Sequence, residues 1–278
     1  MTDLTSPPSP IQATAHRELR GSRPIRTGTA SPSLSLLGRF CLRYGADVVD
    51  VGAAGQRLLA YLGLRRHTTR TVLAGVLWPD ASDPRALGSL RTALWKLHRD
   101  RQPVVACQQD ILSLADTVTV DVGALRDSAR QIVQAPGPGT DYAPASATLL
   151  ATFLGGDLLP GWDEDWVLLE RESLRQLRLH ALETLAADLT TGGQHALALE
   201  AGLECVRMEP LRESAHRVVA AVHLAEHNLA EAVRQYEAFR ELLRSELGVE
   251  PSATFRAMVR NLGVPTSDCG NSLRPMDM

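Results

Sequence analysis

Hydrophobic and polar residues alternate in short, distinct patterns along the first 120 residues. Apolar runs at 34–44 and 48–51 predict two strands joined by a tight turn. Leucines at helical spacing then predict an amphipathic helix over 53–66. A second helix follows, which Thr69 can cap and Pro79 must end, because the residue before a proline disfavours the helical conformation.

A third helix, predicted over residues 85–101, has two different faces. Asp83 and Pro84 mark its start, because aspartate accepts free backbone N–H groups and proline has no N–H to leave unpaired. At 100° per residue, four leucines fall on one stripe, which predicts the buried side: Leu87, Leu90, Leu94 and Leu97. Hydrogen-bond donors fall on the opposite side: Arg85, Ser89, Thr92, Lys96 and Arg99. The flanking positions are Arg91, Trp95 and His98.

Two further apolar runs, 103–107 and 111–114, predict a β-hairpin around Gln108 and Gln109, and 118–122 predicts a returning strand. Strands, three helices of which the last is basic, and a hairpin form the order of a winged helix-turn-helix. A helix of this width fits the major groove of DNA, where arginine and lysine reach base edges and phosphates, while the wing contacts the neighbouring backbone.

The second half is predicted to be almost entirely helical. Five helical stretches end at proline, asparagine or glycine and cover 164–193, 194–210, 212–228, 229–248 and 252–263. An offset of 34 residues aligns three pairs, which is typical of tetratricopeptide repeats: Ala196 with Ala230, Ala198 with Ala232, and Cys205 with Phe239. The predicted fold is therefore mainly α with small β elements, a winged helix-turn-helix followed by an all-α tetratricopeptide-like domain.

Segments rich in proline, glycine and serine mark boundaries that divide the chain into five parts. They are a disordered leader (1–32), the winged helix (33–122), a connecting helix and linker (123–146), the helical domain (147–262) and a disordered tail (263–278).

Charge is distributed unevenly between the two halves. Residues 1–120 hold 15 Lys plus Arg against 9 Asp plus Glu, and residues 121–278 hold 14 against 23, which together give the net charge of −3. A basic first half favours a polyanion, and the acidic second half favours protein contacts. The sequence shows neither a signal peptide nor a membrane span, which predicts a cytoplasmic location, and the four cysteines form no metal or redox motif.

Enzyme signatures are weak. The sequence HLAEH (223–227) fits a zinc-peptidase pattern, yet its histidines are better explained as favourable charges at a helix C-terminus. The acids of GWDEDW (161–166) fit a metal cluster less well than a helix cap, and its two tryptophans are better explained as core anchors. Phosphate-binding and hydrolase motifs are absent from the sequence. We therefore expect no enzyme activity, no cofactor and no metal.

Three motifs in the first half, at 56–62, 73–80 and 89–97, resemble the DNA-binding domain of Streptomyces antibiotic regulatory proteins, which have an OmpR-type winged helix. The stretches 210–217 and 236–252 resemble the bacterial transcriptional activation domain of the same family. This resemblance covers about residues 33–262 and departs from the family pattern at Gly88 and His98. It implies an activator of a secondary-metabolite (antibiotic) gene cluster that binds direct repeats near a promoter and recruits RNA polymerase. If residues 147–262 contact the polymerase, deleting them should abolish activation in a reconstituted transcription assay while DNA binding survives.

The resulting prediction is a sequence-specific activator that binds double-stranded promoter DNA, as a dimer on DNA. The predicted DNA contacts are Arg70, Arg85, Ser89, Arg91, Thr92, Lys96, Arg99, Gln108 and Gln109. Asp80 and Asp83, in the loop before the third helix, are candidates for contacting the sigma factor or the alpha subunit of the polymerase holoenzyme, as the resemblance implies. The alternative is a tetratricopeptide-type adaptor whose winged helix binds protein instead of DNA.

Overall fold

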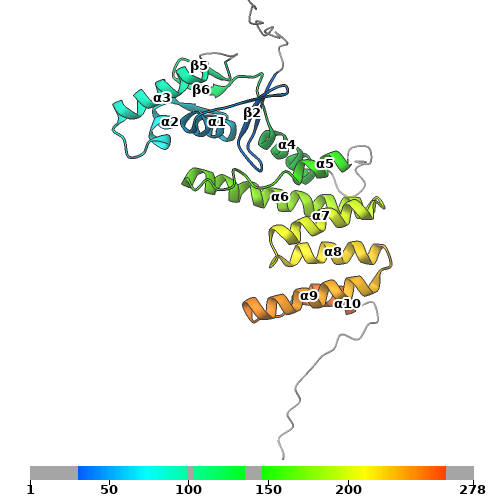
Figure 1. Cartoon of the computed structure of the whole chain (residues 1–278). Coiled ribbons are helices and arrows are strands. Elements are labelled where there is room, and N and C mark those ends of the chain that lie inside the picture. Colours follow the sequence, from blue (N-terminus) through cyan, green and yellow to red (C-terminus); the bar gives the residue numbers. More distant parts are fainter. Residues whose placement is uncertain (1–30, 99–102, 135–145, 261–278) are drawn as a thin grey trace, which may run out of the picture. The chain divides into compact units, whose positions relative to one another are not determined.

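The structure, a computed structural model, describes residues 31–98, 103–134 and 146–260. Within these residues the chain is mainly helical, with two small sheets in its first part and stacked helices in its second part (Figure 1), which confirms the predicted fold class. Some predictions concern residues outside this part of the chain. The predicted leader, linker and tail lie wholly or largely outside the described residues, as does Arg99, a predicted DNA contact.

The first sheet has four strands in the order β3-β2-β1-β7. Their bounds are β1 (Pro32–Ser35), β2 (Cys41–Tyr44), β3 (Asp47–Val49) and β7 (Thr119–Val120). The pairings are antiparallel except between β1 and β7, which run parallel. Three strands therefore replace the two predicted over 34–51, because the chain turns at Gly38, whose φ of 72° favours glycine.

Three helices and the wing follow as predicted. The helices are α1 (Ala53–Arg65), α2 (Arg70–Leu77) and α3 (Asp83–His98). The Thr69 hydroxyl accepts a bond from the Val72 N–H at 3.4 Å, and α2 ends two residues before Pro79. The wing is the antiparallel hairpin of β5 (Val105–Gln108) and β6 (Ile111–Leu114). A short strand that the sequence pattern missed, β4 (His67–Thr69), pairs with β6 and completes a second sheet.

The start of α3 differs from the prediction by one residue. Asp83 was expected to cap the helix with its side chain, but the helix already begins at Asp83. The backbone carbonyl of Ser82 accepts the N–H groups of Arg85 and Ala86, both at 2.9 Å. Ser82 therefore occupies the position before the first turn, and the Asp83 carboxylate lies within that turn, where negative charge is favourable.

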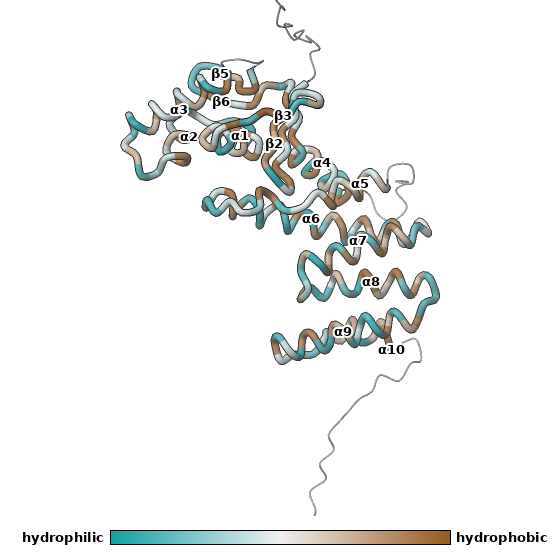
Figure 2. The backbone as a smooth tube through the Cα atoms, viewed as in Figure 1, coloured by the Kyte–Doolittle hydropathy of each residue, from teal (hydrophilic) through white to brown (hydrophobic). Residues whose placement is uncertain are grey.

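The remaining helices stack in sequence order, each packed on its neighbours (Figure 1). They are α4 (Asp121–Gln134), α5 (Ser146–Phe153), α6 (Asp165–Thr191), α7 (His195–Met208), α8 (Glu213–Ala225), α9 (Leu229–Leu247) and α10 (Ala253–Arg260). Only α5 was not predicted. Figure 2 shows hydrophobic and hydrophilic residues alternating along these helices, as helices with one buried side require.

The 34-residue repeat is visible in the burial of its members. Ala198 and Ala232 are both fully buried, as are Cys205 and Phe239. Ala196 and Ala230, by contrast, are both exposed, so this pair does not lie where helices cross. In the part of the chain that the structure describes, no helix combines the length and the apolar character needed to cross a membrane.

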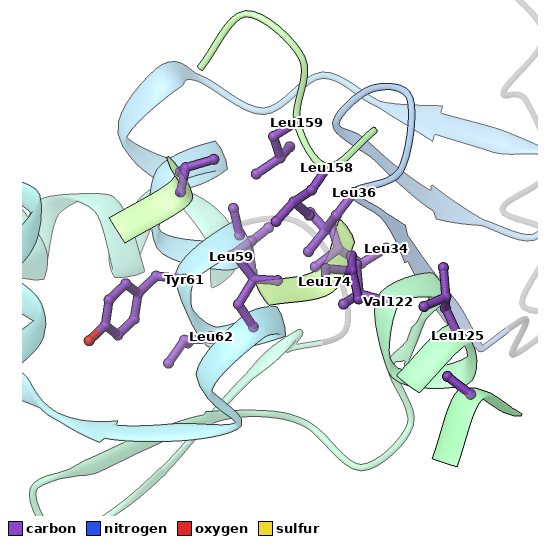
Figure 3. Packing of buried hydrophobic residues seen from close by; sticks show 14 of the residues in the cluster. Leu34, Leu36, Leu59, Tyr61, Leu62, Val122, Leu125, Leu158, Leu159 and Leu174 are labelled. Carbon is purple, nitrogen blue, oxygen red and sulfur yellow. The ribbon is translucent and has the colours of Figure 1, made fainter. Parts of the chain in front are cut away.

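One hydrophobic core joins the winged helix to the first helices of the second half. Leu158, Leu159 and Leu174 lie among leucines of β1, the following loop and α1 (Figure 3). Leu37 and Leu158 form an isolated β-bridge. The Arg171 guanidinium donates to the carbonyls of the segment before α6, at Leu158, Leu159 and Trp162, over 2.8, 2.6 and 2.9 Å.

Ion pairs reinforce this junction. The Glu170 carboxylate lies 3.0 Å from Arg65 and 2.5 Å from Arg126, and its side chain is only 13% exposed. Glu164 pairs with Arg57 of α1 at 2.9 Å. The acids of GWDEDW were expected to cap α6, but Glu164 at the cap position makes no side-chain cap bond, because its carboxylate is turned toward Arg57. The tryptophans do pack on the core, as predicted.

His216, in the second half, occupies a structural position. His216 is 5% exposed, and its Nε2–H donates to the Pro210 carbonyl while Nδ1 accepts from Gln235, both at 2.8 Å. Burial lowers the pKa of His216 and so favours the neutral ring that these bonds require. In HLAEH, α8 ends at Ala225 and His227 follows with a φ of 60°. Among the described residues, no three metal-type side chains converge there or elsewhere.

Candidate nucleic-acid interface

The buried side of α3 fixes the orientation of the whole helix. Leu90 and Leu94 are buried, with Leu87 and Leu97 partly buried beside them, as the leucine stripe predicted. Two alanines that the sequence analysis did not single out, Ala86 and Ala93, complete this side. Because the helix is held by its apolar face against α1 and α2, its opposite face is turned to solvent.

The solvent-facing side of α3 is cationic. Arg85, Arg91 and Lys96 are exposed, as is Thr92, while Ser89 is half-buried. Within the described residues, no acidic side chain forms an ion pair with Arg85, Arg91 or Lys96. Three positive charges on one helix face repel one another unless an external anion compensates them, so this face is suited to a polyanion.

The wing carries the two predicted glutamines at its tip. Gln108 ends β5, and Gln109 forms the turn with a φ of 56°; both side chains are exposed. A two-residue hairpin turn needs such a left-handed backbone, which asparagine or glycine would adopt at lower cost. The turn therefore holds Gln108 and Gln109 outward at the edge of the wing.

Arg70 connects the start of α2 to this wing. Its guanidinium donates to the Cys107 sulfur at 3.0 Å and lies 3.9 Å from the Asp110 carboxylate. Its backbone N–H donates to the Asp110 carbonyl at 3.1 Å. Arg70 was predicted to contact DNA. Its contacts within the protein give it a second role, which is to position the wing.

His98 makes the corresponding connection at the other end of α3. Its Nε2 lies 3.1 Å from the Val105 carbonyl oxygen, so the ring donates to the first residue of β5. At this position, where the chain departs from the family pattern, the hydrogen bond joins α3 to the wing. His98 was not among the predicted DNA contacts, and this bond gives it a structural role.

Two features of α3 were missed or left open by the sequence analysis. Trp95 was placed at the flank, yet its side chain is 58% exposed on the solvent-facing side. Gly88 lies on the same side, and a Cβ added there would meet nothing within 4 Å. Counting from Gly88 in steps of four and three residues reaches Thr92 and Trp95, a spacing by which the sequence could have identified this line.

The two predicted polymerase contacts are both exposed. Asp80 lies in the loop before α3, and Asp83 lies in the first turn of α3.

Comparisons with known proteins place the second half of the chain in a known family. The bacterial transcriptional activator domain family matches residues 124–262. Regulatory protein AfsR of Streptomyces coelicolor is 30% identical over 215 residues, covering 74% of this chain and 21% of that protein. AfsR of Streptomyces griseus is 28% identical over 226 residues, covering 78% of this chain and 23% of that protein. The chain thus spans about a fifth of the length of these curated relatives.

The fold also resembles a solved structure, that of Mycobacterium tuberculosis EmbR in complex with a low-affinity phosphopeptide. The TM-score is 0.61 at 19% sequence identity, over 84% of this chain and 65% of that chain. At this identity the likeness concerns the fold alone, and it extends across both halves of the chain described above.

Proposed function

Because the chain belongs to the bacterial transcriptional activator domain family, we propose that it regulates transcription by binding promoter DNA through α3 and the wing. The residues proposed to contact the duplex are those predicted from sequence. Arg85, Ser89, Arg91 and Thr92 face base edges, whereas Lys96, Arg99, Arg70 and the wing glutamines contact the phosphate backbone.

The observation that carries this proposal is the contrast between paired and unpaired cations. Arginines of the second half are largely neutralised by nearby acids, as in the pairs of Arg212 with Glu183 and Arg178 with Glu204. The cations on α3 have no such partner among the described residues. A surface that keeps its positive charge uncompensated is the expected footprint of nucleic-acid binding.

We further propose that the target is a direct repeat near a promoter of a secondary-metabolite cluster, occupied by two copies of the chain. The resemblance to Streptomyces antibiotic regulatory proteins supports this choice. Footprinting on promoters of such clusters in the source organism should show protected repeats separated by about one helical turn, since each copy presents one recognition helix. Protection of no repeat in any such promoter would refute the proposal.

RNA polymerase is the proposed protein partner, contacted by the loop before α3 and by the acidic helical half. Asp80 is exposed in that loop, outside the DNA-facing side of α3. Replacing Asp80 by alanine should lower activated transcription in a reconstituted assay by about fivefold or more. A factor of about five corresponds to the lower end of the coupling free energies that typically link two binding sites. Affinity for the promoter duplex should not change.

The matched control for that experiment is Asp116→Ala, which removes an exposed acid from the turn between β6 and β7. It changes the net charge by the same amount and should leave transcription unaltered. Equal loss of transcription in both variants, or full activity of the Asp80→Ala protein, would count against the loop as the polymerase contact.

A further inference from the structure

A narrow strip along the centre of the exposed face of α3 differs from its flanks. Gly88, Thr92 and Trp95 lie on one line of the helix, at positions i, i+4 and i+7. This line is opposite the buried side that contains Leu90 and Leu94. Among the described residues of α3, Arg85, Arg91 and Lys96 lie beside this strip and not on it.

The strip presents apolar groups outward. The Thr92 hydroxyl donates to the Gly88 carbonyl at 3.0 Å, so its one donor proton is used within the helix and its methyl group is left to face solvent. Trp95 adds an aromatic ring that is 58% exposed. An apolar surface of this kind between charged flanks costs free energy in water unless something covers it.

Gly88 has no evident use within the protein. An added Cβ would meet nothing within 4 Å, whereas one at Gly55 of α1 would lie 2.8 Å from the Val51 side chain. A glycine in a helix interior is less favourable than alanine, because it loses more backbone freedom on folding. At Gly55 the packing explains that cost. At Gly88 the remaining consequence is that the helix backbone can approach an external surface more closely.

We propose that this strip reads thymine methyl groups in the major groove, an inference that rests on the proposed DNA-binding function. The thymine C5-methyl is the apolar group that base edges present in that groove. Gly88 allows the helix to approach the groove floor, and the Thr92 methyl and the Trp95 ring then cover one or two such methyl groups. The flanking cations contact phosphates and neighbouring base edges.

The test uses the full chain and the duplex that it selects from a random DNA pool. Each thymine of the selected duplex is replaced in turn by deoxyuridine, which removes the methyl group and leaves base pairing intact. We expect affinity to fall about fourfold at one or two positions, the effect of exposing one buried methyl group. The other thymines should tolerate replacement.

Two substitutions of Thr92 separate its methyl group from its hydroxyl. Thr92→Ser keeps the hydroxyl and should no longer distinguish thymine from deoxyuridine at one of the sensitive positions. Thr92→Val keeps the methyl group and should still distinguish them. Gly88→Ala should not lower the melting temperature, because the new methyl group meets no neighbour, but should weaken binding to the selected duplex.

The outcomes separate this inference from the function on which it rests. If the protein enriches no sequence and binds no duplex, the proposed function fails. If the selected site lacks thymine, or if binding tolerates deoxyuridine at every position, the DNA-binding function stands and the strip does not read methyl groups. The same conclusion follows if the Gly88→Ala variant binds the selected duplex as tightly as the unaltered protein.

Discussion

A chain that ends at residue 145 will not fold. Such a truncation removes Leu158, Leu159, Val167 and Leu174, all of which are at most 4% exposed and belong to the same core as β1 and α1 (Figure 3). Each buried side chain of this kind contributes about 1.5–3 kcal/mol, so the loss is about 6–12 kcal/mol. This is comparable with the whole stability of a typical protein, about 5–15 kcal/mol.

The shared core changes what a deletion experiment can show. From the domain boundaries predicted by the sequence, DNA binding was expected to survive removal of 147–262. The packing leads us to expect the opposite, because the DNA-binding half would lose one wall of its core together with the partners of Arg57, Arg65 and Arg126. Thermal unfolding followed by circular dichroism should show no cooperative transition for this truncation.

A chain that ends at Gly193 is the matched control. It keeps α5 and α6, and with them every contact named above, while it lacks α7 to α10. It should unfold cooperatively and bind duplex DNA. If the chain ending at residue 145 unfolds cooperatively and binds DNA as tightly as the full protein, the shared core does not stabilise the winged helix.

Several elements defined by local pattern were predicted correctly. The leucine stripe of α3, the Thr69 cap and the arrest of α2 before Pro79 depend on residues a few positions apart, which the sequence displays directly. Likewise, the wing follows from two apolar runs with a short turn between them. In each case the chemistry that fixes the structure lies within the segment itself.

Features that depend on distant partners were not predicted. Strand β4 exists because it pairs with β6, which lies more than forty residues further along the chain. Nothing in the sequence around Glu170 distinguishes it from an ordinary surface acid, whereas in the structure it forms ion pairs with Arg65 and Arg126. Trp95 was placed at the flank of the predicted helix, and the packing of α3 against α1 and α2 leaves its side chain 58% exposed. Non-local contacts decide these positions, and one sequence does not show them.

Loss of the three exposed cations of α3 should have the largest effect on DNA binding. Replacing Arg85, Arg91 and Lys96 together by alanine should weaken specific binding by at least about 100-fold, since each such contact is worth about 1–3 kcal/mol. Folding should be nearly unaffected, because all three side chains are exposed. The dependence on salt should also become shallower, by about 0.9 in log–log slope for each phosphate that the variant no longer neutralises.

A second triple variant controls for net charge. Arg130, Arg234 and Arg244 have side chains that are 56%, 70% and 50% exposed on α4 and α9. Replacing them by alanine removes the same three charges away from α3. If long-range attraction by net charge alone explained DNA binding, the two triple variants would lose affinity equally.

The affinity of these three proteins for the duplex that the unaltered protein selects is the most direct test of α3 as the DNA-binding helix. Fluorescence anisotropy at two salt concentrations gives both the affinity and its salt dependence. We predict tight binding by the unaltered protein and by the Arg130, Arg234 and Arg244 variant, with a loss of at least about 100-fold for the α3 variant. Equal affinity of the folded α3 variant and the unaltered protein would contradict the assignment.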